Sequence, residues 1–458
     1  MQQQKRPHQA AFFTPLFARG IMSTSKKFMK TEVVVIGGGC AGLMAARGLA
    51  RAGRRVTLIE ARSRLGGRIL TEDCGGIPVE LGAEFIHGRP PVLLELLREL
   101  QLPFFESGGK FYRVRQGKIT RGDEETDFGG RGEGDDPFAA LKDLNASATQ
   151  DMTFARAARD MSPAMTEEQR GWLTRYVEGF NAADAGRISA ASLKVQQIAE
   201  DAIDSDSSYR PTYGYKSMID GLAQECRDAG VEFAMATPAR SILWQRGEVV
   251  VACDAQEFHA ARCIVTLPVG VLKSGEVMFQ PRPDEFFAAL DAVEMGDARR
   301  ISLLFDSPFW LERAPQLSFL IDGEEDSALN AWWSPHPEPW PLLTGWVGGP
   351  RALNITSAEE LLAGALAALS RYFGETEPEL RRRLRSWHTH DWHAEEYARG
   401  AYSYVVAGGL PDLPLLAEPV EGTLFFAGEH TEQDGHWGTV HAALSSGLRA
   451  AGQVLKSA

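Results

Sequence analysis

The feature that most constrains this chain is a glycine-rich turn between an apolar strand and a helix. Val33–Ile36 is an unbroken β-branched run that leads directly into Gly37-Gly38-Gly39-Cys40-Ala41-Gly42. A helix-compatible segment follows over residues 43–52, and residues 55–59 form a second apolar strand that ends at Glu60. This order predicts a βαβ unit of the kind that opens a doubly wound parallel sheet.

The same spacing predicts that the turn binds the phosphates of a dinucleotide. Gly37 permits the tight turn, Gly39 lets the backbone approach a pyrophosphate, and Gly42 allows the helix to pack closely. The carboxylate of Glu60 can accept hydrogen bonds from ribose hydroxyls, which suits an unphosphorylated ribose better than a 2′-phosphate. The alternative is a glycine-rich turn without a ligand, and the ordered strands with their terminal acid favour nucleotide binding.

A second glycine pair narrows the choice of dinucleotide. Arg64-Leu65-Gly66-Gly67-Arg68 comes soon after Glu60 and resembles the second glycine pair of flavoproteins that bind FAD in an extended form. We expect Arg62 and Gly67 to contribute to the cofactor site. Arg68 would supply a fixed cation near the phosphates or the flavin edge.

Composition excludes several other classes of protein. The 458 residues suffice for two to three domains of near-average globular composition. The 48 Lys and Arg against 61 Asp and Glu give a net charge of −13, which argues against nucleic acid as the main partner. The five cysteines form no Cys-x-x-Cys pair, so we expect no disulfide framework, and no apolar run of about 18 residues predicts a membrane span.

The first thirty residues are basic and carry only a short apolar stretch, which Pro15 interrupts. We expect residues 1–30 to be either a disordered tail or the product of a misassigned start codon. In the second case translation would begin at Met22 or Met29. A targeting arm is the alternative. We expect a cytoplasmic protein.

Later blocks of sequence carry a resemblance to a known family. They are Glu80–Gly88, Thr266–Leu272, Arg399–Tyr404, Leu424–Glu429, Trp437–Ala443 and Ser446–Ala451. With them the chain resembles the flavin-containing amine oxidase family, which includes monoamine and polyamine oxidases. The blocks occur in family order over residues 32 to 455, which is more specific than any single motif.

The resemblance implies an α/β fold with a Rossmann-like FAD-binding domain assembled from discontinuous segments. We expect residues 31–110, 214–300 and 387–458 to form this domain. An inserted α+β substrate-binding domain would comprise residues 111–213 and 301–386.

The resemblance also implies further contacts to the cofactor. Gly428 and Glu429 follow an apolar strand whose end can meet the phosphates or the ribityl chain. The backbone amides near Thr439 and Val440 would face the flavin pyrimidine at the start of the last helix. The backbone of Ala239 matches a position that contacts adenine.

The aromatic positions beside the flavin depart partly from the family pattern. Tyr402 matches the first aromatic position, and Thr439 stands where monoamine oxidases place a second tyrosine. This departure favours the polyamine oxidase or bacterial branches. Because Ala401 rather than a cysteine precedes Tyr402, we expect noncovalent FAD.

A second departure lies at Arg300, where many family members carry a lysine that holds a water against flavin N5. Arginine cannot act as a base near neutral pH, so we expect reduced reactivity with oxygen or another electron acceptor. An alternative places Arg300 on a surface strand, paired with an acid.

Two further residues are predicted near the substrate. We expect His87 to contact the substrate nitrogen or to tune local charge, and the alternative is a structural histidine. We expect Glu84 either to attract a cationic substrate or to turn outward.

Two groups of residues invite interpretation without a motif. We expect that only a minority of six aromatic residues face a ligand and that the rest form core. The six residues are Phe305, Phe309, Trp310, Trp332, Trp333 and Trp346. The histidines of residues 388–393 fit no standard zinc spacing, so we predict no metal site.

The function that follows is oxidation of a small-molecule amine by FAD. The substrate would be a primary or secondary amine, such as a polyamine or an amino acid derivative, with O2 or another acceptor reoxidising the flavin. Arg300, Tyr402 and His87 are the candidate catalytic residues. The alternatives are a related flavoprotein that dehydrogenates a non-amine substrate, and a catalytically silent flavin-binding scaffold.

Overall fold

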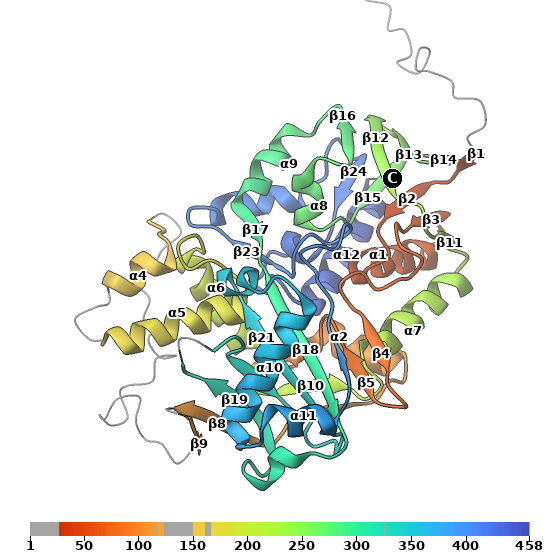
Figure 1. The fold of residues 1–458 in the computed structure, drawn as a ribbon. Coiled ribbons are helices and arrows are strands. Elements are labelled where there is room, and N and C mark those ends of the chain that lie inside the picture. Colours follow the sequence, from red (N-terminus) through yellow and green to blue (C-terminus); the bar gives the residue numbers. More distant parts are fainter. Residues whose placement is uncertain (1–26, 116, 123–149, 161–165, 325–326, 458) are drawn as a thin grey trace, which may run out of the picture.

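A five-stranded parallel sheet forms the centre of the nucleotide-binding half of the molecule (Figure 1). The computed structural model describes residues 27–115, 117–122, 150–160, 166–324 and 327–457. In sheet order the strands are β11 (Glu232–Ala234), β3 (Val56–Ile59), β2 (Val33–Ile36), β15 (Arg262–Val265) and β24 (Leu424–Phe426). These strands come from widely separated parts of the chain, which confirms the expected Rossmann-like sheet assembled from discontinuous segments.

The sheet is covered on both faces, and the pleat explains why its strands are continuously apolar. Val33 and Val35 of β2 face a helical layer, while Val34 and Ile36 face a second sheet. The helical layer consists of α1 (Cys40–Arg51), α7 (Tyr215–Asp228) and α12 (Val440–Lys456). The second sheet consists of β1 (Lys27–Lys30), β14 (Gln256–Ala260), β13 (Glu248–Cys253), β12 (Ala239–Gln245) and β16 (Met278–Gln280).

Strand β1 corrects one expectation about the N-terminal residues. Lys27–Lys30 pairs in parallel with β14, and Met29 packs against the core between the two sheets. The expectation that residues 1–30 form a tail is therefore wrong for residues 27–30. A translation start at Met29 would remove part of this strand. Residues 1–26 lie outside the described residues.

A seven-stranded sheet forms the other half of the molecule (Figure 1). Its order is β22 (Leu384–His388), β18 (Ala298–Phe305), β21 (Leu342–Gly348), β20 (Ala331–Trp333), β19 (Leu317–Asp322), β8 (Lys110–Arg115) and β9 (Lys118–Arg121). The helices α10 (Ala358–Phe373) and α11 (Glu377–Arg383) share an apolar core with it. A helical group beside this sheet comprises α4 (Phe154–Asp160), α5 (Glu167–Asn181) and α6 (Ala190–Ala202).

Three expected domain boundaries fall inside strands of this sheet. The boundaries after residues 110, 300 and 386 would divide β8, β18 and β22. Because a strand is held by hydrogen bonds along its whole length, we propose boundaries that leave these three strands whole within the seven-stranded sheet.

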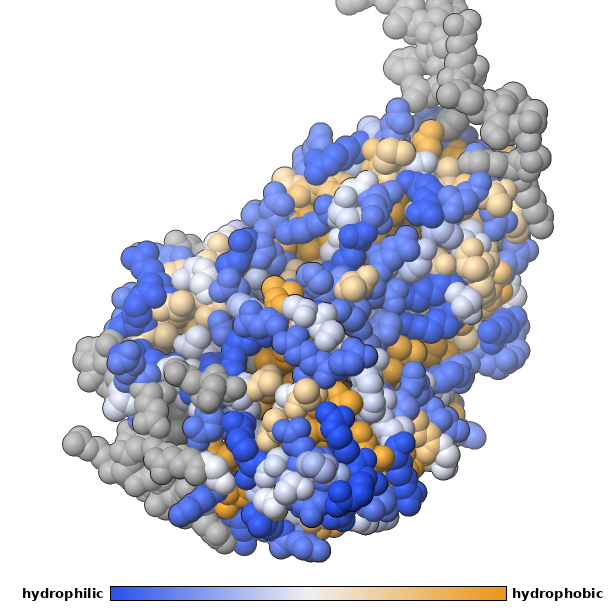
Figure 2. Space-filling view, in the orientation of Figure 1, coloured by the Kyte–Doolittle hydropathy of each residue, from blue (hydrophilic) through white to orange (hydrophobic). Residues whose placement is uncertain are grey.

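Short strands and helices complete the described fold. They are β4 (Thr71–Asp73) with β5 (Pro78–Glu80), β6 (Ile86–His87) with β10 (Ser208–Pro211) and β7 (Phe104–Glu106), β17 (Val293–Met295) with β23 (Ser403–Val405), and the helices α2 (Pro91–Glu99), α8 (Val269–Ser274) and α9 (Asp284–Ala289). Hydrophilic residues cover most of the face shown in Figure 2, which agrees with apolar cores that lie between the layers. None of the described helices has the length and hydropathy of a membrane span.

Candidate active site

A cavity of about 640 Å³ lies where the carboxyl ends of the parallel strands meet the seven-stranded sheet and helices α5 and α6. All fifteen residues predicted for the site line this cavity except Gly42, which packs directly behind its wall. The fourteen that line it are Gly37, Gly39, Glu60, Arg62, Gly67, Arg68, His87, Ala239, Arg300, Tyr402, Gly428, Glu429, Thr439 and Val440.

Two glycine loops build one end of the cavity. The amide of Gly66 donates to the carbonyl of Gly38 at 2.9 Å, which ties the second loop to the first. Gly37 has a φ of +107°, a conformation that L side chains rarely adopt. A Cβ on Gly42 would lie 1.9 Å from the carbonyl oxygen of Gly37, so only glycine allows α1 to begin this close to the turn. A Cβ on Gly39 would meet nothing nearer than 3.9 Å, so the surface of the turn is open there.

Glu60 holds the first glycine turn through hydrogen bonds to its carboxylate. It is buried, and its carboxylate accepts hydrogen bonds from the amide of Gly38 at 2.6 Å and from the amide of Arg62 at 2.8 Å. The guanidinium of Arg62 forms an ion pair with Glu395 at 3.3 Å. The two residues therefore form a polar wall beside Ala239, which begins β12 and also lines the cavity.

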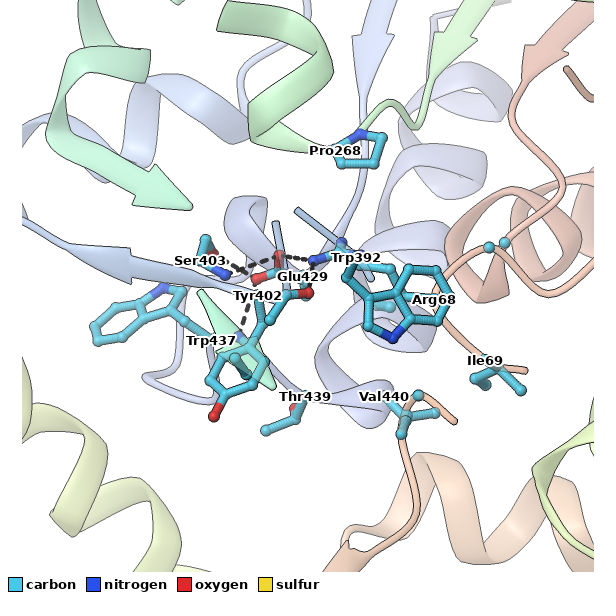
Figure 3. Close-up of a pocket in the computed structure, with 18 of the residues that line it drawn as sticks. Arg68, Ile69, Pro268, Trp392, Tyr402, Ser403, Glu429, Trp437, Thr439 and Val440 are labelled. Atoms are coloured by element: carbon cyan, nitrogen blue, oxygen red, sulfur yellow. Dashed lines mark hydrogen bonds and ion pairs between the residues drawn. The ribbon is translucent and has the colours of Figure 1, made fainter. Parts of the chain in front are cut away.

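Glu429 organises the middle of the cavity (Figure 3). Its carboxylate accepts hydrogen bonds from Arg68 at 2.9 Å, from the amide of Gly438 at 2.9 Å and from the Ser403 hydroxyl. Burial opposes the charge, but Arg68 and the Ser403 hydroxyl hold the pKa of Glu429 below its ordinary value. Glu429 thus joins three distant segments, and it fixes the Arg68 guanidinium at the cavity wall.

The last helix presents its amino end to the same space. Thr439 is the N-cap of α12, and its hydroxyl accepts a hydrogen bond from the amide of Ala442 at 3.1 Å. Val440 is the first helical residue and lies beside Thr439 at the cavity edge (Figure 3). The positive end of the helix dipole therefore faces the cavity, where it would stabilise an anionic group.

Tyr402 lies beside Thr439, where the aromatic part of the cavity begins (Figure 3). Its ring is nearly parallel to that of Trp346, at 13° and 6.5 Å between centroids, and its hydroxyl donates to the carbonyl of Phe180 at 2.6 Å. Burial raises the pKa of Tyr402, so the phenol stays protonated. The Trp346 ring supplies a second aromatic surface where the sequence indicated an incomplete cage.

His87 faces the same aromatic region. Its ring lies 5.8 Å from the ring of Phe180 and 5.8 Å from that of Phe85. Burial lowers the pKa of His87 to about 4, so the imidazole is neutral at physiological pH. A neutral imidazole can accept a hydrogen bond from an amine without repelling a cation.

Arg300 lies in a buried charge cluster, which corrects two expectations. It is 5% exposed, so it is not on a surface strand, although it does pair with an acid. One side of its guanidinium donates to Glu84 and to the carbonyl of Gly82 at 3.0 Å. Arg210 contacts the same Glu84 at 2.7 Å. Glu84 therefore neither turns outward nor offers a free charge to a substrate.

The indole of Trp333 completes this cluster by donating to Glu84 at 2.9 Å. Burial opposes the charge of Glu84, but Arg300, Arg210 and Trp333 hold its pKa below its ordinary value. The two arginines therefore compensate the buried negative charge of Glu84 at the cavity wall.

The structure separates the six aromatic residues singled out in the sequence, and a minority of them line the cavity. Trp333 and Trp346 line the cavity, whereas Phe305, Phe309, Trp310 and Trp332 pack in the core of the seven-stranded sheet. Phe180 and Trp392 also line the cavity and were not predicted as site residues, because each reaches the cavity only through the packing of distant elements. The alternation of side chains in β20 turns Trp332 to the core and Trp333 to the cavity, and this alternation is the signal that could have separated the two tryptophans.

The residues present fit FAD. The two glycine loops leave a backbone surface that side chains would fill, and the amino ends of α1 and α12 point to the same cavity. Arg68 provides a cation between them, and Glu60 lies at the end expected for ribose. Gly37, Gly39, Gly67 and Gly428 would hold the phosphates and ribityl chain, and Thr439 and Val440 the flavin pyrimidine.

The structure shows no metal centre in the part of the chain that it describes. Within residues 388–393, His390 pairs with Glu395 at 3.0 Å and His393 with Asp297 at 2.6 Å. Each imidazole therefore has its own acidic partner, and the group does not converge on one point.

Comparisons with known proteins identify the family and agree with the fold. Residues 40–455 match the family of flavin-containing amine oxidoreductases. Polyamine oxidase 2 of Arabidopsis thaliana is 28% identical over 92% of this chain and 88% of its own length. Human lysine-specific histone demethylase 2 is 25% identical over 94% of this chain and 54% of its own length.

Solved structures show the same fold. A putrescine oxidase variant superposes with a TM-score of 0.80 at 22% identity, covering 94% of this chain and 100% of the other. Cyclohexylamine oxidase from Brevibacterium oxydans gives 0.79 at 23% identity, covering 93% and 99%. Because the family match spans most of its length and the described cavity fits the cofactor, the chain belongs to the flavin-containing amine oxidoreductases and is an FAD-dependent oxidoreductase of the amine oxidase type.

Proposed function

We propose that this enzyme removes a hydride equivalent from the carbon beside a neutral primary or secondary amine, leaving an imine that water hydrolyses. The substrate belongs to the polyamines or the amino acid derivatives, and relatives named polyamine oxidases support the first of these classes. When bound, FAD supplies the hydride acceptor at N5.

The observation that carries this proposal is the continuity of the cavity. The cavity wall runs from the glycine loops past Arg68, which donates to the carbonyl of Ala401 at 3.0 Å, to Tyr402. Trp346 and Phe180 continue this wall. An amine held against these rings would lie next to the cofactor cradle rather than in a separate pocket. Aromatic faces can position an amine and its carbon chain without fixing it as an ammonium in an ion pair.

The residues of the aromatic side would each have a separate task. Tyr402 and Trp346 orient the C–H bond and exclude bulk water. His87, which is neutral, accepts a hydrogen bond from the amine nitrogen. Because Glu84 is already paired with two arginines, it does not hold the substrate nitrogen in its protonated, unreactive form.

We further propose that the reduced enzyme passes its electrons to O2 slowly or uses another acceptor. Arg300 has both terminal nitrogens engaged, with Gly82 and Glu84, and it cannot release a proton near neutral pH. A lysine at this position would hold a water through a more compact ammonium group.

Anaerobic mixing with a panel of amines tests the main proposal. The panel contains a monoamine, a diamine, a polyamine and several amino acid derivatives, and flavin absorbance is followed with time. We expect rapid loss of the oxidised flavin spectrum with at least one amine. No bleaching with any amine, in enzyme that reductant bleaches normally, would overturn the proposal.

A further inference from the structure

A second group of reactive side chains lies outside the cavity, at the turn between β4 and β5. All five cysteines of the chain are described and free, and four of them are buried. Cys74 is the exception, being partly exposed at this turn. A Cβ added to either of the next two residues, Gly75 and Gly76, would meet no atom within 4 Å, so the turn that follows Cys74 is open to solvent.

Cys74 contacts a histidine that is itself held by an acid. Its Sγ lies 3.3 Å from Nε2 of His388, and Nδ1 of His388 lies 2.7 Å from a carboxylate oxygen of Glu72. The hydroxyl of Ser386 shares Nε2 at 2.9 Å. Thiol, imidazole and carboxylate therefore follow one another in the order that activates a nucleophile.

The geometry is that of a proton relay and not of a chelate. Cys74 and Glu72 contact opposite nitrogens of the His388 ring, so their ligand atoms cannot converge on one cation. Since Glu72 accepts the Nδ1 proton, Nε2 is left as the acceptor that faces the thiol. The described residues also contain no group of three ligands that could hold a metal.

Backbone hydrogen bonds fix the two elements that meet here. The amide of Cys74 donates to the carbonyl of Ile77 at 2.9 Å, which closes the turn of the β4–β5 hairpin. His388 ends strand β22 and pairs with Ser302 in β18. The contact between thiol and imidazole therefore joins two ordered strands rather than two free loops.

We propose that Cys74 is a modification site that reacts with hydrogen peroxide. His388 takes the thiol proton, and the sulfur electron pair attacks one peroxide oxygen. The S–O bond forms as the O–O bond breaks, and the departing hydroxide takes the proton from His388 and leaves as water. Sulfur is oxidised by two electrons to the sulfenic acid, and peroxide is reduced.

A base is required because the thiol is not ionised beforehand. Burial, Glu72 and Asp73 raise the pKa of Cys74. Proton removal must therefore accompany attack, which is the task of His388. Glu72 acts through His388 and is a positioning residue.

Transfer of two electrons from reduced flavin to O2 produces hydrogen peroxide, so the slow reaction with O2 proposed above would supply it, whereas another electron acceptor would not. Only the production of peroxide by the enzyme itself rests on the proposed function. Reagent peroxide can be added to the flavin-bound enzyme in the absence of any amine, so the chemistry of Cys74 is tested whether or not the enzyme oxidises amines.

The test is trapping of the sulfenic acid with dimedone, followed by peptide mass spectrometry. We expect an adduct on Cys74 in the wild type and none in Cys74→Ser. His388→Gln should slow adduct formation roughly tenfold or more, whereas His393→Gln, a nearby exposed histidine away from the thiol, should not. Glu72→Ala should slow the reaction and Glu72→Asp should restore it.

Two outcomes would overturn the proposal. One is an absence of any Cys74 adduct in the wild type. The other is an unchanged rate in His388→Gln when its melting temperature and flavin absorbance equal those of the wild type. Should the variant not fold, the wild-type rate decides: Cys74 must react faster than a free cysteine peptide at the same pH, and an equal or slower rate would refute base assistance.

Discussion

Arg300 shows how one residue can redirect the reactivity of a site. Its guanidinium is buried beside Glu84 and Arg210 and makes a cation–π contact with Trp333 at 5.5 Å. Such a planar cation, engaged at both terminal nitrogens, cannot be exchanged for an ammonium without loss of contacts. A lysine in place of Arg300 would keep the positive charge of the site, but it would not keep the hydrogen-bonding geometry of the guanidinium.

We therefore predict that Arg300→Lys reacts with O2 faster than the wild type, by roughly tenfold, because lysine can hold a water and exchange a proton. Rapid mixing of the reduced enzyme with oxygenated buffer measures the reoxidation rate. Arg299→Lys is the matched control, since Arg299 instead contacts Ile355 and Asp391. Equal rates in wild type and Arg300→Lys would remove the argument for a reduced oxygen reactivity.

Tyr402 offers a second prediction at this scale. Tyr402→Phe removes only the hydrogen bond to Phe180 and should change flavin reduction little. Tyr402→Ala also removes the ring stacked on Trp346, so the amine loses its orientation, and reduction should slow roughly 10- to 100-fold. Anaerobic stopped-flow reduction with the best amine separates the two variants. A slow Phe variant would instead assign the effect to the hydroxyl.

At the scale of elements, the start of α1 depends on a close approach of backbone to backbone. We predict that Gly42→Ala pushes the helix away from the turn, costs about 1–3 kcal/mol of stability and weakens FAD binding. Gly48→Ala is the control in the same helix, because its Cβ would meet Ala451 at an ordinary 3.4 Å. Denaturant unfolding and flavin titration measure both effects. Equal FAD affinity in the two variants would contradict the role given to Gly42.

The elements also show what the sequence can predict. The strand, turn and helix of residues 33–51 were predictable because every signal in them is local: β-branched residues, glycines at fixed spacing and a terminal acid. Strand β1 was not, because Lys27–Lys30 has no alternating pattern and forms only by pairing with β14, far along the chain. The same limit applies to Arg210 and Glu84, whose contact depends on how two remote elements pack.

At the scale of the molecule, buried neutral histidines predict a loss of stability in acid. Burial lowers the pKa of His87 and His430 to about 4 and that of His441 to about 3. Between about pH 6.5 and pH 4 the unfolded chain binds protons that these groups in the folded protein do not. The free energy of unfolding should therefore fall as pH drops, by up to about 1.4 kcal/mol per pH unit for each histidine.

Denaturant unfolding at several pH values across this window measures the slope. His441→Asn should reduce the slope by nearly one proton, because burial lowers the pKa of His441 to about 3. A stability that stays constant down to about pH 4 would show that the three imidazoles are protonated without cost.

The order of the strands in the parallel sheet has a consequence for biosynthesis. The ribosome makes β24 and α12 after the other strands and helices of this sheet and its helical layer, yet β24 pairs with β15 and α12 packs against α1. A nascent chain that stops before β24 exposes an unpaired strand edge and lacks Glu429, the partner of Arg68. Flavin should consequently load only after translation has passed the last helix, and ribosome-stalled chains lacking α12 should retain no flavin, whereas capture of the cofactor by such chains would show that the earlier segments suffice.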